Sequence, residues 1–183
     1  MIIVLSPAKT LDYSSSKNID DYSSPVFLNK SKNLIGELKK KNPNEISKLM
    51  KLSDKLTSLN VERYQTWKAR KKPSDNSKQS IYVFKGDVYQ GLDIESFSKK
   101  DTIFAQKHLR ILSGLYGILK PLDIIEPYRL EMGTKLKTKE GSDLYDFWGK
   151  DISEEIEKEL KKMKSKTLIN LASNEYYDSV KSL

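Results

Sequence analysis

The chain has 183 residues, a formal net charge of +8, one histidine and no cysteine. The lack of cysteine excludes disulfides, zinc–thiolate sites and thiol catalysis, and the single histidine, His108, excludes sites built from several imidazoles. No apolar run approaches the ~18 residues that a membrane helix needs, so we expect no membrane association.

The first half of the chain predicts one short strand followed by helices. Residues 1–5, MIIVL, form a continuous apolar run that is typical of a buried strand. Serine, aspartate, asparagine and proline punctuate residues 15–25, which we expect to form a surface loop. Apolar residues then recur at helical spacing. Three helices are predicted, over residues 25–41, 43–52 and 54–71.

The second half alternates short apolar runs with helical patterns. The predicted strands cover residues 81–84, 110–113 and 167–172. The predicted helices are a turn after Gly86, residues 98–108, residues 142–164 and a last helix from Asn174. Strands separated by helices indicate an α/β fold. We therefore predict a single α/β domain over residues 1–183, with a mixed sheet covered by helices.

Four strand ends are followed by clusters of polar and small residues: IIVLSPAKT, IYVFKGDVYQG, RILSGLYGILKP and LINLASNEYY. Ligands of open α/β sheets sit beyond the carboxyl ends of the strands, so we expect these clusters to converge on one cleft. Its lysines and hydroxyls suit a phosphate-bearing ligand, although no P-loop or dinucleotide fingerprint is present. The predicted cleft residues are Ser6, Lys9, Lys85, Asp87, Tyr89, Ser113, Tyr116, Asn170, Ser173, Asn174 and Glu175.

Each of these residues also has a purely structural interpretation. Ser6 can cap the loop after the first strand, and Lys9 can be a surface lysine. Asp87 and Ser173 can cap the helices that follow them. The positive net charge favours a polyanion such as nucleic acid, but a lysine-rich composition is also what an AT-rich genome produces.

The stretch from Leu109 to Gly133 carries three glycines and two prolines within an apolar run, more special residues than a packing element needs. YRLEMG places Arg129 and Glu131 on the same side of a predicted strand, either as a structural ion pair or as an arginine that holds a phosphate. SGLYGILKP is similar to a helix-hairpin-helix, although two residues instead of one separate its glycines.

Five blocks of the sequence, in order and spacing, resemble the bacterial YaaA family of peroxide stress resistance proteins: SPAKTLD, FKGDVYQGLD, LRILSGLYGILKPLDIIEPYRLEMGTKL, LYDFWG and LINLASNEYY. The resemblance implies a cytoplasmic protein with a distinctive α/β fold, a positively charged cleft and a helix-hairpin-helix element. It also implies survival of peroxide with lower free iron, and binding to double-stranded or branched DNA. The family pattern continues past the last block, so we expect this chain, ending at Leu183, to lack a basic C-terminal segment.

The resemblance carries roles onto individual residues. DNA or phosphate binding is predicted for Ser6, Lys9, Lys85, Arg110, Tyr116, Lys120, Arg129 and Ser173. Tyr89, Glu131 and Asn170 are predicted to line the cleft, with no cofactor and no resident metal. The alternative hypothesis is an enzyme acting on a phosphate-bearing or nucleic-acid ligand, with Asp87 or Glu175 as the base. Direct iron binding by Asp87, Glu131 and Glu175, with His108 as an optional further ligand, is the third hypothesis.

Overall fold

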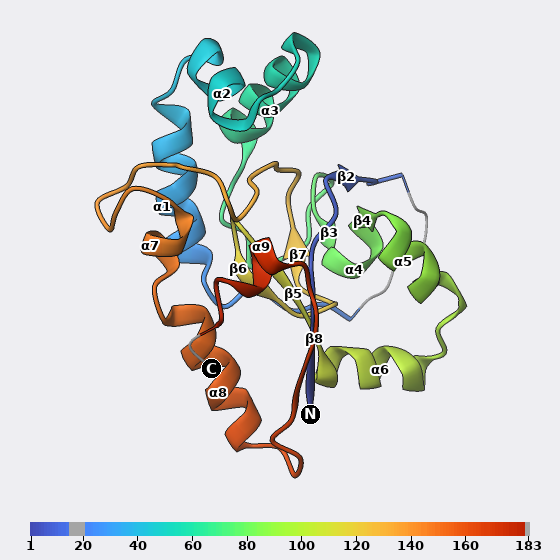
Figure 1. Ribbon diagram of the computed structural model, residues 1–183. Helices are drawn as coiled ribbons and strands as arrows, with labels where there is room; N and C mark the ends of the chain where they lie inside the picture. Colours follow the sequence, from blue (N-terminus) through green and yellow to red (C-terminus); the bar gives the residue numbers. More distant parts are fainter. Residues whose placement is uncertain (15–20, 182–183) are drawn as a thin grey trace.

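A four-stranded sheet lies at the centre of the computed structural model, which describes residues 1–14 and 21–181 (Figure 1). The strand order is β6-β5-β1-β8, with β1 at Ile2–Leu5, β5 at Leu109–Ser113, β6 at Gly117–Leu119 and β8 at Leu168–Leu171. β1 runs parallel to both β5 and β8, whereas β6 runs antiparallel to β5. The predicted mixed α/β sheet is therefore confirmed, including all three of its parallel strands.

The burial of the strands follows from their place in the sheet. All five residues of β5 are buried, and Ile2, Val4 and Leu5 of β1 are buried as well. Continuous apolar runs of this kind are typical of parallel strands that are covered on both faces. β8 is less protected, because Asn170 and Leu171 are exposed.

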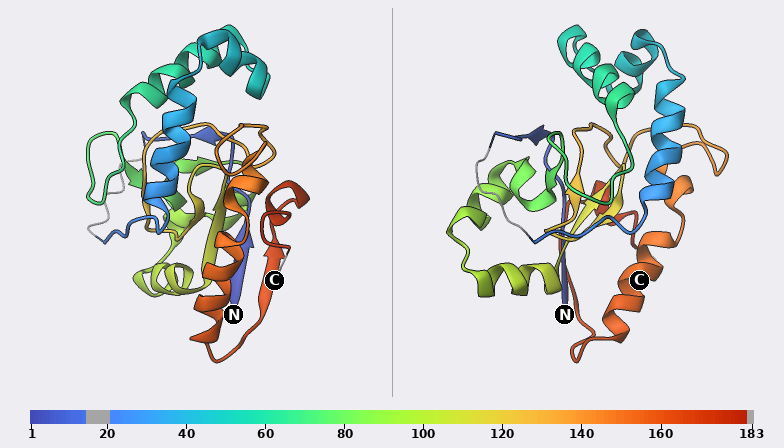
Figure 2. Two further views of the ribbon diagram at one scale, coloured as in Figure 1. Left: turned by 90° about the vertical axis from the view of Figure 1, so that its left-hand side faces the viewer. Right: turned by 180° about the vertical axis from the view of Figure 1, so that it is seen from behind.

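Helices flank the sheet on two sides (Figures 1 and 2). One side carries α1 (Leu28–Lys39), α7 (Leu144–Trp148) and α8 (Asp151–Lys161), and the other carries α4 (Ser80–Val83), α5 (Asp87–Leu92) and α6 (Lys99–His108). A 3-10 turn at Ile94–Ser96 precedes α6, and α9 is Asn174–Tyr177. Ser98 caps α6 through a capping box with Asp101, as expected from the serine at this position. No helix among the described residues is long and apolar enough to cross a membrane.

Two helices form an arm that projects beyond the carboxyl ends of the parallel strands (Figures 1 and 2). This helical arm consists of α2 (Pro43–Met50) and α3 (Asp54–Thr66). Asn42 and Glu45 form a capping box at the start of α2, and Pro43 occupies its first turn. α3 ends at Thr66, before the predicted end at residue 71, and the next residue, Trp67, is buried in the core.

Two predicted elements are wrong. Residues 81–83 belong to a helical turn, α4, and only Phe84 of the predicted strand lies in a strand, the short β4 (Phe84–Lys85), because a short buried apolar run has the same appearance in either structure. The Ser80 hydroxyl holds this turn by donating to the carbonyl oxygens of Lys120 and Pro121. The predicted helix over 142–164 is divided into α7 and α8 at Gly149, whose φ of 50° interrupts helical geometry.

The stretch SGLYGILKP forms a β-hairpin between β5 and β6, with Ile111 opposite Leu119, and not the helix-hairpin-helix that we predicted there. The amide of Tyr116 donates to the Ser113 hydroxyl at 3.0 Å, which stabilises the turn. Gly117 has a φ of 71°, and a side chain there would clash with Trp148. Two further two-stranded sheets pair β2 (Thr10–Leu11) with β4, and β3 (Lys78–Gln79) with β7 (Ile124–Ile125). Of the loop predicted at 15–25, residues 15–20 lie outside the described part of the chain.

Candidate functional site

The ends of β1 and β8 meet through two serines. The Ser173 amide donates to the Ser6 Oγ at 2.9 Å, and the Ser6 hydroxyl donates to the Ser173 Oγ at 3.2 Å. These residues are far apart in the sequence, but each follows a strand, and the two strands are parallel neighbours. Two of the four predicted polar clusters therefore lie together at the carboxyl edge of the sheet.

The cluster KGDVYQG also lies beside the end of β1, but it does not follow a strand of the four-stranded sheet. Thr10, just after the SPAK loop, pairs with Lys85 in the small β2–β4 sheet. The buried Tyr89 donates its hydroxyl to the Ser6 carbonyl oxygen at 2.8 Å. Asp87 is exposed at the first position of α5, and Lys85 lies 4.0 Å from Asp12. Two hydrogen bonds from Ser14 lower the pKa of Asp12, so its negative charge offsets part of the Lys85 charge.

The end of β5 places the segment from Tyr128 to Glu131 beside these loops. The hydroxyls of Ser113 and Tyr128 are hydrogen bonded at 2.7 Å. Gly114 lies so close to this segment that an added Cβ would stand 2.3 Å from the Leu130 carbonyl oxygen. The segment is irregular and not a strand, contrary to prediction, although Arg129 and Glu131 do lie together. Parts of all four clusters thus lie at or next to this edge of the sheet, through Ser6, Ser173, Tyr89 and Ser113.

Three charged side chains gather at this convergence. Arg129 Nη2 donates to Glu131 Oε1 at 2.9 Å, and Lys9 Nζ lies 3.4 Å from Glu131 Oε2. The Lys9 side chain is 66% exposed, whereas that of Arg129 is only 18% exposed. Arg129 Nε is buried and has no hydrogen-bond partner among the described residues. One carboxylate therefore partly neutralises two cations, and one buried N–H donor is left unsatisfied.

The helical arm brings a further cation to this place. Tyr64 of α3 donates its hydroxyl to the Arg129 carbonyl oxygen, which fastens the arm to the Tyr128–Glu131 segment. Arg63, the preceding residue, is half-buried, and this burial lowers its pKa; the proximity of Arg129 lowers it further. Arginine nonetheless stays charged at neutral pH. Two guanidinium groups are thus held near one another, an arrangement that an anion would stabilise.

The hollow between these groups is small, with room for little more than one water molecule, about 20 Å³. Its walls are the SPAK loop, the segment 128–131 and Tyr176. Burial raises the pKa values of Tyr128 and Tyr176, so both hydroxyls stay neutral and act as hydrogen-bonding groups instead of bases. We call this arrangement the strand-end site: Ser6, Lys9, Tyr128, Arg129, Glu131, Ser173, Glu175 and Tyr176.

The two predicted bases, Asp87 and Glu175, have different surroundings: Asp87 is exposed at the start of α5, whereas Glu175 is hydrogen bonded to neighbouring segments. Glu175 Oε1 accepts the Gly133 amide at 2.9 Å, and the Glu175 carbonyl oxygen accepts the Tyr145 hydroxyl at 2.8 Å. This carboxylate therefore ties α9 to the loop after the segment 128–131. Asn170 of β8 is exposed, and its Oδ1 accepts the amide of Ala172. Among the described residues, no group of three or more aspartates, glutamates or histidines is arranged to hold a metal ion.

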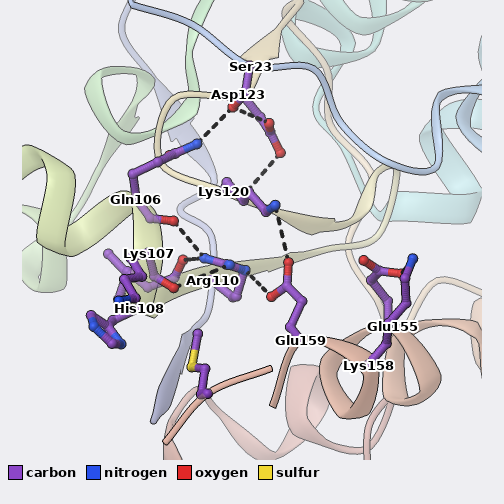
Figure 3. A network of polar contacts seen from close by, with 12 residues as sticks. Ser23, Gln106, Lys107, His108, Arg110, Lys120, Asp123, Glu155, Lys158 and Glu159 are labelled. Carbon is purple, nitrogen blue, oxygen red and sulfur yellow. Dashed lines mark hydrogen bonds and ion pairs between the residues drawn. The ribbon is translucent and has the colours of Figure 1, made fainter. Parts of the chain in front are cut away.

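Three predicted binding residues lie elsewhere. Arg110 is at the start of β5, away from the carboxyl edge, and is only 4% exposed (Figure 3). Its Nε donates to Glu159 Oε2 at 2.7 Å, and its Nη1 donates to the carbonyl oxygen of Gln106 at 3.0 Å. Lys120 approaches the other oxygen of Glu159 at 3.3 Å. Arg110 thus stabilises the C-terminus of α6, where free carbonyl groups favour a cation.

Tyr116 belongs to the core. Its hydroxyl accepts the indole N–H of Trp67 at 3.0 Å and the amide of Glu126 at 3.1 Å, and the residue is 1% exposed. Sequence reasoning also missed Tyr64, Arg63 and Tyr176, which contribute to the strand-end site. Tyr176 belongs to the block LASNEYY, next to the predicted site residue Glu175, and its position after a strand end could have indicated it. The two residues of α3 gave no local signal, because only the fold brings the arm to this edge.

The fold and the site define an α/β protein whose mixed sheet gathers lysine, arginine and glutamate at the carboxyl ends of its parallel strands. The family model described as "Peroxide stress protein YaaA" matches residues 1–182, and the chain belongs to this family. The chain is similar to a UPF0246 protein of Polynucleobacter necessarius subsp. necessarius (strain STIR1), with 51% identity over 177 residues, or 97% of this chain and 68% of that protein. A UPF0246 protein of Marinomonas sp. (strain MWYL1) is 54% identical over 180 residues, covering 98% of this chain and 68% of that protein.

Proposed function

We propose that this peroxide stress protein binds DNA at the strand-end site and the adjoining arm, and that this binding helps to limit iron-dependent oxidative damage. The observation that carries the proposal is the pairing of Lys9 and Arg129 with a single carboxylate, Glu131. The Arg63 guanidinium is a further positive charge, whose pKa is lowered by burial and by the proximity of Arg129. A DNA phosphate would provide a second anion for Lys9 and the Arg129 guanidinium.

The small volume of the hollow favours a phosphate group of a polymer over a small-molecule ligand. Small-molecule sites bury most of their ligand in a pocket of about 300 Å³ or more, and this hollow holds about 20 Å³. A duplex instead needs an accessible surface along which several cations contact successive phosphates. The exposed Lys9 is placed for such a contact.

The helical arm offers the second contact with the backbone. Lys51 at its turn adopts a left-handed conformation with a φ of 52°, Leu52 is buried, and Ser53 begins α3 without a side-chain capping bond. The first amides of α3 are therefore available to an anion, and the helix dipole favours negative charge there. Lys48 and Lys55 are exposed on either side of the turn. This arrangement, and not SGLYG, is the part of the chain that we propose as its helix-hairpin-helix.

Gel-shift titrations of the protein with duplex and branched DNA at low and moderate salt test the binding. We expect binding at low salt that weakens steeply as salt rises, because phosphate contacts release counterions. Binding that is absent at low salt, or insensitive to salt, would refute the proposal. Survival of peroxide by cells that lack the endogenous protein, complemented with the parent or a Lys51→Glu/Lys55→Glu variant, tests the link to protection: only the parent is expected to protect.

A further inference from the structure

A second exposed basic surface lies at the opposite end of the sheet, where the parallel strands begin. It is built from α6 and from the loop between α8 and β8, and the C-terminal end of α6 and this loop lie beside the N-terminus in Figures 1 and 2. We call it the lysine surface: Lys100, Phe104, Lys107, His108, Lys164 and Lys166. The four lysines are exposed, and the strand-end site contributes no residue to it.

The first residue of the chain joins the two halves of this surface. His108 Nδ1 donates to the Met1 carbonyl oxygen at 2.7 Å, and the Met1 nitrogen donates to the Ser165 carbonyl oxygen at 2.6 Å. The Ile2 amide donates to the Thr167 carbonyl oxygen at 2.9 Å. The lysines on either side of Ser165 are therefore held next to the end of α6.

An exposed aromatic ring lies within this basic surface. Phe104 is 53% exposed, and its ring centroid lies 4.5 Å from that of His108. Lys100 and Lys107 are one helical turn before and after Phe104, so they flank the ring on the same face of α6. The carboxylate of Asp101 on the same helix is hydrogen bonded to Ser98 in the capping box, at the far end from His108.

We propose that the lysine surface binds single-stranded nucleic acid, with a base stacked on Phe104 and the lysines in contact with the phosphates. Aromatic side chains within a positively charged track are the means by which proteins hold unpaired strands, since every base has a face to stack. A duplex keeps its bases stacked on one another and offers Phe104 no such face. This ligand and this surface are distinct from the duplex binding proposed at the strand-end site.

The exposed apolar area of the lysine surface is too narrow to favour binding to a membrane. Membrane-bound helices present a broad apolar face, whereas the exposed large apolar residues of α6 are Ile103 and Phe104 only, among its described residues. Lysines precede and follow this pair at residues 99, 100 and 107. The pattern of one or two apolar side chains between cations matches a stacked base between phosphates.

Fluorescence anisotropy of a labelled oligothymidylate tests the proposal, with the full chain and its variants. Phe104→Ala is expected to weaken binding about tenfold, within the range of base stacking on one aromatic residue, while Phe104→Trp keeps the parent affinity. Lys164→Gln/Lys166→Gln is expected to reduce the slope of log affinity against log salt by about 1.4, or about 0.7 for each phosphate contact. The matched control, Lys39→Gln/Lys41→Gln, removes the same charge at the far end of α1 and should leave the slope unchanged.

Three results would overturn the proposal. The first is parent-like affinity of Phe104→Ala for oligothymidylate, and the second is an equal loss of slope in the control pair. The third is that Phe104→Ala loses binding to phosphatidylserine vesicles but keeps its binding to oligothymidylate, which would assign the surface to membranes. Because Phe104 is remote from the strand-end site, Phe104→Ala should keep the duplex affinity of the parent. Duplex affinity therefore tests the proposal for the strand-end site, and oligothymidylate affinity tests the proposal for the lysine surface.

Discussion

Replacement of Glu131 by glutamine is predicted to strengthen DNA binding. The Glu131 carboxylate approaches Lys9 at 3.4 Å and Arg129 at 2.9 Å, so it competes with an incoming phosphate for both cations. A phosphate in contact with Lys9 at about 2.8 Å would lie about 6 Å from the carboxylate. At that distance, in the high dielectric of an exposed site, the repulsion is about 0.7 kcal/mol, so Glu131→Gln should bind about threefold more tightly.

The cost in stability is expected to be small. The Lys9 side chain is 66% exposed, and exposed ion pairs contribute about 0–1 kcal/mol. A glutamine oxygen also still accepts the hydrogen bond from Arg129. Anisotropy titrations of duplex DNA with the parent and Glu131→Gln, at one fixed salt concentration, measure the effect, and thermal melting serves as the control for folding. Weaker binding by a stably folded variant would refute this reasoning and would mean that the carboxylate orients Arg129 for its ligand.

Three further predictions concern the framework and the alternative function. Gly114→Ala should lower the free energy of unfolding by about 1–3 kcal/mol, measured by denaturant titration, because its Cβ would meet the Leu130 carbonyl oxygen at 2.3 Å; an unchanged midpoint would contradict the close approach. Burial raises the pKa of Asp123 above 3.8, so just above pH 3.8 the folded state binds more protons than the unfolded state. As pH rises from 3.8 through the raised pKa, the free energy of unfolding of the parent should therefore fall relative to that of Asp123→Asn. A difference between the two proteins that stays constant with pH would contradict this prediction. Asp87→Asn and Glu175→Gln should protect cells from peroxide as well as the parent does, and loss of protection in either would favour the enzyme hypothesis.

The parallel core of the fold was predictable because its strands have strong local signals. Residues 1–5, 110–113 and 167–172 read as strands, and β1, β5 and β8 lie there. Residues 81–84 have the pattern of a strand for the same reason, but residues 81–83 belong to a single turn of helix, α4. Its hydrogen bonds are to Lys120 and Pro121, and such distant partners leave no trace in the local pattern.

The meeting of the polar clusters after β1 and β8 was predictable from topology, but the direction of individual side chains was not. Ser6 and Ser173 both follow parallel strands, so their meeting follows from strand order alone. Arg110 belongs to the same block as Arg129 and Glu131, yet it lies at the beginning of β5 and pairs with Glu159. Tyr116 is turned into the core by the β-hairpin, which the spacing of Gly114 and Gly117 did not reveal.

The most direct test of the account is the salt dependence of duplex DNA binding by the parent and by Lys9→Gln/Arg129→Gln. Each phosphate contact contributes about 0.9 to the slope of log affinity against log salt. Because Lys9 and Arg129 would hold one phosphate between them, we predict that the double variant binds more weakly and that its slope is lower by about 0.9, with its thermal melting showing that it is folded. An unchanged affinity and slope in the folded variant would contradict the claim that the grouped cations of the strand-end site hold the DNA backbone.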